Sequence, residues 1–180
     1  MALETLVAPA VEPVSLIAAR AFLRIGTDGD DSVLTSLLIG AREALEARTG
    51  RALVTATLRQ RFMGVPLTNM DLPGTLLPGS IPATNLVAVR LIAKDGSEAQ
   101  APSGLVVLID GRFVVTAPLG TNTIGLSLDY QAGHGPSAAT VPEAFKISIL
   151  EAVADALTRR DTGSADGGLS WDQAFREVKL

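Results

Sequence analysis

The chain contains no cysteine, a single histidine and few aromatic residues, and each shortage removes a class of function. Among its 180 residues there are one tryptophan, one tyrosine and five phenylalanines. Without cysteine the chain forms no disulfide and offers no thiolate to a metal ion, which suits a reducing compartment such as the cytoplasm. So few aromatic rings make a stacking platform for nucleic-acid bases unexpected. The interior must therefore be built mainly from leucine, valine, isoleucine and alanine.

Positive charge is in deficit, and no hydrophobic run is long. Lysine and arginine number 15 against 19 aspartates and glutamates, which leaves a net charge of −4. Such a chain lacks the broad positive potential from which non-specific nucleic-acid binding draws its affinity. Although 47% of the residues are hydrophobic, no stretch approaches the ~20 apolar residues that a membrane-spanning helix needs. At the N-terminus, Glu4, Pro9 and Pro13 contradict a secretory signal. We expect the protein to bind no membrane and to make no specific contacts with DNA.

Two helices are predicted between residues 15 and 50. Ser15 is a suitable N-cap, and the apolar spacing after it predicts a short helix that ends at Gly26. Asp30 or Asp31 can cap the second helix and complement its dipole. Gly50 stands where a left-handed residue commonly ends a helix.

The second helix carries an ion pair, and a third helix is predicted near the end of the chain. Arg42 and Glu46 lie four residues apart, a favourable spacing that we place on the solvent side of the second helix. The third helix is predicted to begin at Thr140 or Val141 with Pro142 in its first turn, where the missing N–H costs nothing. It is expected to end near residue 160.

Between residues 51 and 139 the pattern changes to short β-prone runs separated by glycine, proline, asparagine and aspartate. Asp110 and Gly111 stand between two such runs, as in a tight hairpin whose turn residues take positive φ. Residues 94–97 predict another turn. Four prolines between residues 64 and 83 indicate an ordered loop or a sheet edge, because proline cannot donate to a sheet ladder.

The predicted fold class is therefore α+β. A small helical bundle of two N-terminal helices and one C-terminal helix is interrupted by an antiparallel β domain, because three short amphipathic helices are not stable unless they pack together. We assign residues 1–50 and 140–160 to a discontinuous helical domain and residues 51–139 to the inserted β domain. Residues 161–180 are predicted to be a flexible spacer followed by a partner-binding tail.

No catalytic, cofactor or metal site emerges from the sequence. His134 lies between two glycines in a predicted loop, which is poorly suited to holding a catalytic base against Ser137. The acidic run at Asp28, Asp30 and Asp31 resembles the opening of a calcium loop, but position 39, where the bidentate acid belongs, is Ile39. No phosphate-binding, dinucleotide-binding or zinc-protease motif is present.

Two sets of residues are candidates for contact with partners. Arg59 and Arg61 alternate along a predicted strand, so both face the same way; they form either a solvated strand face or a stripe that lines a ring or faces a partner. The tail holds the only tryptophan, a residue type that often dominates interface energy. The tail either packs on its own core or anchors to a partner. Its apolar residues are Leu169, Trp171, Phe175, Val178 and Leu180.

The order of several motifs resembles the phage head-tail connector family, also called adaptor proteins, which occurs in tailed phages, prophages and gene transfer agents. The matching residues of the opening stretch are Ser15, Leu16, Ala19, Leu23, Arg24 and Ile25, then Asp30, Asp31, Leu34, Ile39, Ala41 and Arg42, then Thr49, Gly50, Arg51, Ala52 and Leu53. Further on, residues 130–135 are similar to the family's Tyr-x-Ala-Gly-Tyr-Gly pattern, and residues 141–143 to its Val-Pro-x helix start. His134 departs from the aromatic residue that is more common there.

The resemblance implies a structural protein without catalysis or cofactor. Such proteins form a closed homo-oligomeric ring, usually of about twelve copies, whose interfaces need two different faces on each subunit. The ring lies in the particle neck between the portal protein and a head-tail stopper or other neck protein, and DNA passes through it without specific binding. The helical part would form the ring. The tail residues from Leu169 to Leu180 are the candidate portal contact, and synthesis would occur in the bacterial cytoplasm.

Three other classes compete with this interpretation. A stopper or tail-terminator protein would be mainly β, which the three helices oppose. A small hydrolase or β-domain binding protein unrelated to virions could use the proline-rich loop as a cleft, but the aromatic and acidic clusters of such sites are missing. A transcriptional regulator would need a basic helix face, which the second helix lacks.

Overall fold

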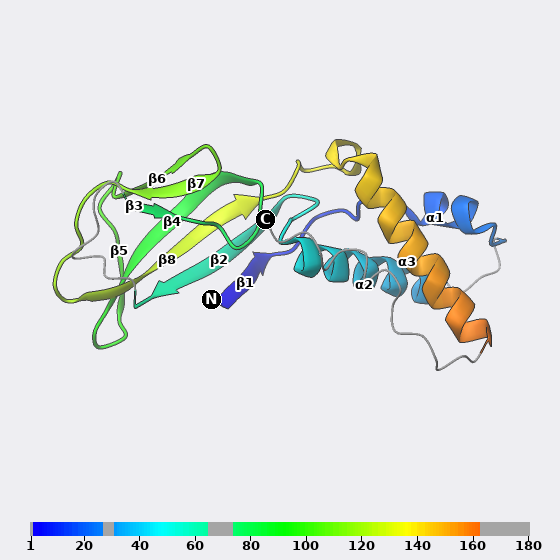
Figure 1. Cartoon of the computed structure of the whole chain (residues 1–180), viewed down its shortest axis with the longest axis horizontal. Helices are drawn as coiled ribbons and strands as arrows, with labels where there is room; N and C mark the ends of the chain where they lie inside the picture. Colours follow the sequence, from blue (N-terminus) through cyan, green and yellow to red (C-terminus); the bar gives the residue numbers. More distant parts are fainter. Residues whose placement is uncertain (1, 27–30, 65–73, 163–180) are drawn as a thin grey trace. The chain divides into compact units, whose positions relative to one another are not determined.

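The computed structural model describes residues 2–26, 31–64 and 74–162, and these divide into two compact units (Figure 1). Unit 1 comprises Met1–Ala10 and Gly50–Pro136 and holds the strands. Unit 2 comprises Val11–Thr49 and Ser137–Leu180 and holds the three α-helices. The predicted α+β class, with three helices and antiparallel sheets, is confirmed. The first ten residues group with the strands, whereas the sequence pattern placed them in the helical domain.

The larger sheet of unit 1 has five antiparallel strands in the order β1-β2-β8-β4-β5. Their bounds are β1 (Ala2–Val7), β2 (Ala56–Met63), β8 (Thr123–Ala132), β4 (Ala83–Ala93) and β5 (Glu98–Gln100). β8 is the central strand and pairs with β2 on one side and β4 on the other. Strand β1 was not expected from the sequence; it forms by pairing with β2, with Glu4 opposite Arg59.

The smaller sheet has three strands in the order β3-β7-β6 and packs its apolar side against the larger one. Its strands are β3 (Gly74–Leu76), β6 (Val106–Ile109) and β7 (Arg112–Val115). Rings from both sheets meet in the core: Phe113 makes edge-to-face contacts with Phe62 and Tyr130, at centroid distances of 6.4 and 5.0 Å. Such pairs contribute about 0.5–1.5 kcal/mol beyond the area they bury.

Local turn chemistry behaves as the sequence predicts. Asp110 and Gly111 have φ angles of 48° and 70° between β6 and β7, as a two-residue hairpin turn of this twist requires. Asp95 accepts hydrogen bonds from the backbone and hydroxyl of Ser97 in the turn between β4 and β5. These hydrogen bonds, the hydroxyl first, lower the pKa of the Asp95 carboxyl.

The end of β8 approaches another segment so closely that only glycine fits. Gly133 has a φ of 137°, and a Cβ there would lie 2.6 Å from the backbone nitrogen of Thr55 and from the carbonyl carbon of Val54. The backbone N–H of Gly133 donates to the carbonyl of Pro82 at 3.0 Å. Three segments of unit 1 therefore meet at Gly133: the end of β8, the Val54–Thr55 backbone and the backbone of Pro82.

Unit 2 contains α1 (Leu16–Leu23), α2 (Asp31–Thr49) and α3 (Glu143–Thr162), which contact one another, with a short 3₁₀ helix at Ala138–Thr140. Ser15 caps α1, as predicted, by accepting from the Ala18 N–H at 3.2 Å. The left-handed residue that ends α1 is Arg24 rather than Gly26. Gly50, with φ 63°, takes the predicted conformation after α2. The core of this unit includes Ala19, Leu34, Leu38, Leu45, Ile149 and Val153.

The prediction that Arg42 lies on the solvent side of α2 is wrong. Its side chain is only 8% exposed and forms ion pairs with Glu46 at 2.7 Å and Glu12 at 2.8 Å. Burial opposes its charge, but the hydrogen bond from Arg42 to Glu12 and the nearby carboxylates outweigh burial, so the pKa of Arg42 is raised. Arg42 therefore fastens the segment before α1 to the middle of α2.

Candidate functional site

Arg59 and Arg61 share the outer face of the five-stranded sheet, as their alternation along β2 predicts. Arg59 lies opposite Asp129 and Arg61 opposite Ser127 in the pairing of β2 with β8. Arg90 of β4 lies opposite Ser127 from the other side. Three arginines from two strands therefore flank the central strand on the side that faces away from the smaller sheet.

Asp129 is the centre of this face. Its carboxylate accepts from the Arg59 Nε at 2.7 Å, the Arg59 Nη2 at 3.0 Å and the Arg90 Nη1 at 2.8 Å. The Asp129 side chain is 6% exposed. Burial would raise the pKa of Asp129, but the hydrogen bonds from Arg59 and Arg90 outweigh it, so that pKa is lowered. The same hydrogen bond raises the pKa of Arg59. Arg59 is thus committed to a partner within the chain.

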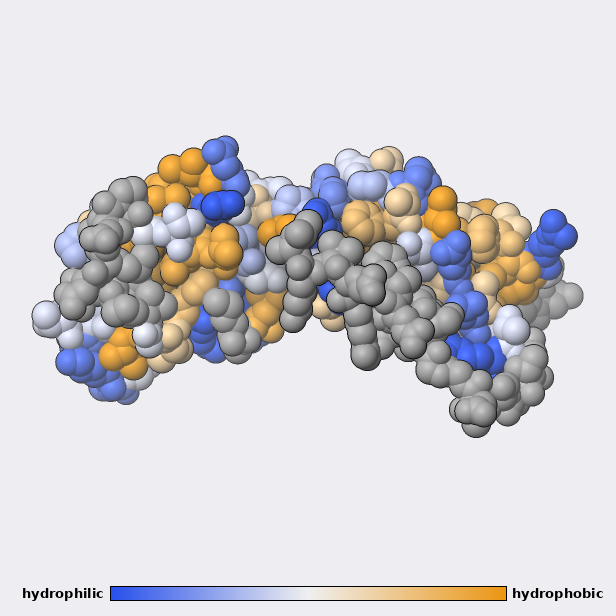
Figure 2. All heavy atoms as spheres, in the orientation of Figure 1, coloured by the Kyte–Doolittle hydropathy of each residue, from blue (hydrophilic) through white to orange (hydrophobic). Residues whose placement is uncertain are grey.

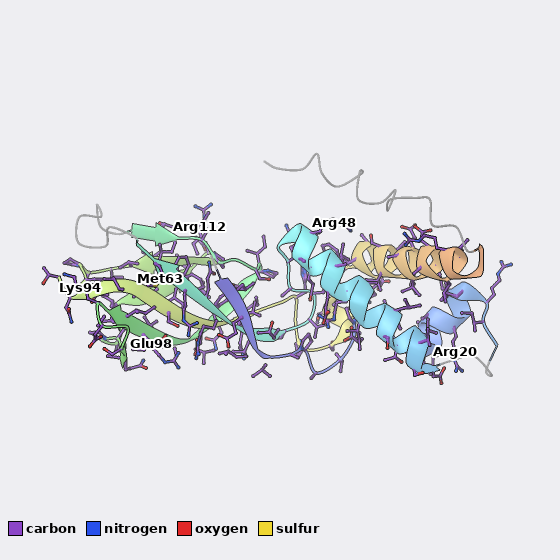
Figure 3. All side chains as sticks on the ribbon, turned by 90° about the horizontal axis from the view of Figure 1, so that it is seen from below. Arg20, Arg48, Met63, Lys94, Glu98 and Arg112 are labelled. Carbon is purple, nitrogen blue, oxygen red and sulfur yellow. The ribbon has the colours of Figure 1, made fainter. Side chains whose placement is uncertain are left out.

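Arg61 is held more loosely. Its guanidinium lies 3.4 Å from the Glu98 carboxylate and 3.9 Å from that of Glu4, and its side chain is 42% exposed. Ion pairs of this exposure are typically worth at most about 1 kcal/mol. Figure 3 shows Glu98 on one side of unit 1 and Arg112 on the other, so the arginine face is one of two distinct outer surfaces of the strand layers.

A buried polar cluster fixes the segment before β4. Gln60 is fully buried; its amide donates to the Leu77 carbonyl at 3.3 Å, and its Oε1 accepts from the Gly79 N–H at 2.7 Å. The Tyr130 hydroxyl accepts from the Ser80 N–H at 3.1 Å and donates to Gln60 Oε1 at 3.4 Å. Burial raises the pKa of Tyr130, which keeps the hydroxyl protonated. The cluster holds a loop rather than a substrate.

The sequence patterns did not predict a role for Asp129, Arg90 or Gln60. A signal was available, since Ser127, Asp129 and Gln131 alternate with apolar residues along β8. That pattern indicates a polar sheet face but not which arginines approach it. Arg59 and Asp129 are seventy residues apart.

His134 and Asp31, two of the residues considered for chemistry, both contact other residues of the chain. The backbone N–H of His134 donates to the Leu53 carbonyl, while burial, and secondarily the charge of Arg51, lower the pKa of His134. Asp31 forms an ion pair with Arg20, which Figure 3 shows beside the first turn of α2. Asp28 and Asp30 lie outside the described residues. In the described part of the chain, no three histidine or acidic side chains gather to hold a metal ion.

Unit 2 exposes apolar side chains on α1 and α3. Ile17 is 81% exposed, Phe22 49% and Ile147 48%. Figure 2 shows hydrophobic residues at the surface over both helices. No helix among residues 2–26, 31–64 and 74–162 has the length and apolar character needed to cross a membrane. Isolated exposed apolar residues are ordinary on folded proteins, whereas a contiguous apolar patch marks a contact surface.

A groove lies between the end of α1 and the last turns of α3. Its volume is about 420 Å³, and it is lined by Phe22, Leu23, Ile25, Ala154, Leu157 and Thr158. Five of these six side chains are apolar and none is charged. The tail residues predicted to contact a partner, Leu169, Trp171, Phe175, Val178 and Leu180, lie outside the described residues.

Chains in three solved structures share this fold, and each match covers 100% of this chain and 97% of the other. They belong to the virion of a native gene transfer agent particle (24% identity, TM-score 0.73), the neck of an empty such particle computed with C6 symmetry (22%, 0.75) and the neck of a native one computed with C12 symmetry (20%, 0.74). No curated protein sequence matches the chain.

A family model provides the more specific match. The model described as phage gp6-like head-tail connector protein matches residues 14–106, more than half of the sequence. The matched region begins just before the Ser15 cap and runs through the helix pair into strand β6. On the strength of this match, the chain belongs to the phage gp6-like head-tail connector protein family.

Proposed function

We propose that the chain is a ring-forming subunit of the neck of a tailed phage or gene transfer agent particle. In this proposal about twelve copies close into a ring, with the portal on one side and a stopper or other neck protein on the other. DNA passes through the ring, and the acidic chain does not hold it, because net negative charge opposes binding to phosphates.

The observation that carries the proposal is the likeness over the full chain to subunits of necks solved with C6 and C12 symmetry. A ring of identical subunits uses heterologous contacts, so each copy needs two different adhesive faces. The exposed apolar residues of α1 and α3 supply candidates in unit 2. Unit 1 also exposes apolar residues, such as Val7 and Val87, so the choice of the helical part as the ring contact remains the expectation that the family resemblance implies.

Of the two arginines proposed for a ring or partner face, Arg61 is the stronger candidate. Arg59 would have to leave a nearly buried carboxylate to bind elsewhere, and an uncompensated Asp129 would be costly. Arg61 would exchange only exposed ion pairs at 3.4 and 3.9 Å. An acidic partner surface could therefore recruit Arg61 at little cost.

The portal contact is assigned in this proposal to the C-terminal segment from Leu169 to Leu180. Trp171 and Phe175 would be its anchors, since large aromatic residues dominate many interfaces. Deleting residues 169–180 should abolish binding to purified portal rings while leaving the chain's own assembly intact. Unchanged affinity for the portal would remove the tail from the proposal.

Ring formation is tested by mass measurement and negative-stain imaging of the purified chain, alone and with portal rings. Ile17→Glu should prevent ring closure, because it places a charge on the exposed face of α1. Ile109→Glu is a matched control, since Ile109 is also exposed, at 52%, but lies in unit 1. Rings that form normally with Ile17→Glu but not with Ile109→Glu would refute the helical part as the ring contact. A chain that stays monomeric with and without portal rings would refute ring formation itself.

A further inference from the structure

The groove between α1 and α3 is an apolar site at the place where the described chain ends. Its α3 side is formed by Ala154, Leu157 and Thr158, and the helix continues to Thr162. At 1.5 Å per residue, Thr162 lies about 6 Å along the helix axis from Thr158 and about 12 Å from Ala154. The last described residue of the chain is therefore only about one helical turn beyond the groove lining.

We infer that this groove seats the apolar C-terminal segment, residues 169–180, of the same chain. Eighteen residues follow Thr162, and the first of them are rich in glycine, serine and aspartate. The eight residues from 163 to 170 span at most roughly 27 Å when extended. That reach exceeds the distance needed to turn back along the last two turns of α3, so Trp171 reaches its own groove without strain.

The spacing of the tail's apolar residues matches a groove between helices. Trp171, Phe175 and Val178 stand at i, i+4 and i+7, which places them on one face of a helix. The lining offers a partner ring in Phe22 and aliphatic surface in Leu23, Ile25 and Leu157, with no charged side chain among them. A volume of about 420 Å³ lies in the range of pockets that enclose a bulky organic group.

Docking in the groove concerns the free subunit and does not depend on portal binding. If the tail also binds the portal as proposed above, the groove and the portal compete for it, and the free subunit keeps its aromatic anchors covered until assembly. The tail can be absent from the groove even if the chain forms rings and binds the portal. It can equally occupy the groove even if the chain does neither. The two proposals are therefore tested by different variants.

The chain carries its own probe, because Trp171 is the only tryptophan. In the intact, monomeric protein we expect short-wavelength tryptophan emission and slow quenching by acrylamide, neither of which changes on dilution. Phe22→Ser should shift the emission to longer wavelength and raise the quenching rate toward that of an exposed tryptophan. Ile17→Ser is the matched control, because it lies on the same helix, is 81% exposed and does not line the groove.

An engineered disulfide tests whether the contact is made within one chain. The protein has no cysteine, so in the full chain Thr158→Cys with Phe175→Cys introduces the only two thiols. We expect an intrachain disulfide in dilute solution, since bridging requires the two Cα atoms to come within about 7 Å. The same variant with Ile17→Cys in place of Thr158→Cys should bridge much less.

Three results would overturn the inference. The first is emission and quenching typical of a solvated tryptophan in the intact protein. The second is an emission shift that Ile17→Ser causes as strongly as Phe22→Ser while circular dichroism shows both variants folded. The third is a covalent dimer formed by mixing chains that carry only Thr158→Cys with chains that carry only Phe175→Cys, which would assign the groove to the tail of a second copy.

Discussion

Replacing Asp129 by asparagine tests the charge arrangement on the outer face of the five-stranded sheet. The substitution keeps the shape of the side chain but removes the negative charge that Arg59 and Arg90 share. Asparagine retains one carbonyl oxygen, so it can accept only part of the three hydrogen bonds that the carboxylate accepts now. Two guanidinium groups then face each other across β8 without the carboxylate that they share, and only the more distant charges of Glu4 and Glu98 still act on Arg59.

The expected loss follows from burial and hydrogen bonding. Removing one partner of a buried ion pair costs about 3–5 kcal/mol. Here the arginine side chains are 21% and 27% exposed, so water recovers part of their hydration. We therefore expect a loss of about 2–4 kcal/mol in the free energy of unfolding. For a chain of this length that lowers Tm by roughly 5–15 °C.

The assay is urea and thermal unfolding of the wild type and Asp129→Asn as a function of pH. The pKa of Asp129 is lower in the folded chain than in the unfolded one, so its stabilisation is present above the unfolded pKa of about 4. It is lost as the pH falls through the lower folded pKa. The difference in the free energy of unfolding between the wild type and Asp129→Asn should therefore be constant near neutral pH and should shrink below about pH 4.

Asp155→Asn is the control, since Asp155 is an exposed aspartate on α3. Its effect should stay within about 0.5 kcal/mol. If Asp129→Asn were as stable as Asp155→Asn at pH 7, or if its deficit did not change between pH 7 and pH 3, the reasoning about this carboxylate would be refuted.

Three further substitutions test other parts of the fold by the same unfolding measurements. Tyr130→Phe should cost about 1–3 kcal/mol, because the buried Ser80 N–H loses its acceptor; no loss would mean that water replaces the hydroxyl. Gly133→Ala should cost at least about 2 kcal/mol, because its Cβ would lie 2.6 Å from neighbouring backbone, whereas Gly96→Ala, with open space around it, should cost less. Arg42→Met should lose about 2–4 kcal/mol by leaving two carboxylates without their cation, and a variant as stable as the wild type would contradict the role given to this ion pair.

Features set by a few neighbouring residues were predictable from the sequence. The Ser15 cap, the left-handed Gly50 and the hairpin at Asp110 and Gly111 all follow from local backbone chemistry. The order of motifs also carried the resemblance to the head-tail connectors, and the family match confirms it. A structural connector rather than an enzyme was expected, and the family is one of connectors.

Features that depend on distant partners were not predictable. Residues 2–7 become a strand because β2, at least fifty residues later, offers a pairing edge. Arg42 has a typical surface spacing with Glu46, and only Glu12, thirty residues away, explains its burial. Glutamine on a strand often faces solvent, whereas here the buried side chain of Gln60 binds the segment before β4. The spacing of apolar residues describes one helix or strand at a time. It therefore does not show which distant segments of the chain will contact each other.

The central position of β8 has a consequence for synthesis on the ribosome. Strands β1, β2, β4 and β5 are all made before β8, yet β2 and β4 have no contact in the sheet order except through it. The five-stranded sheet cannot close until residue 132 has left the exit tunnel, and α1 and α2 likewise await α3. Unit 1 can therefore fold before unit 2, because its last strand ends at residue 132 and α3 comes later, at Glu143–Thr162. The edges of β2 and β4 that pair with β8 must be protected from mispairing until β8 has emerged.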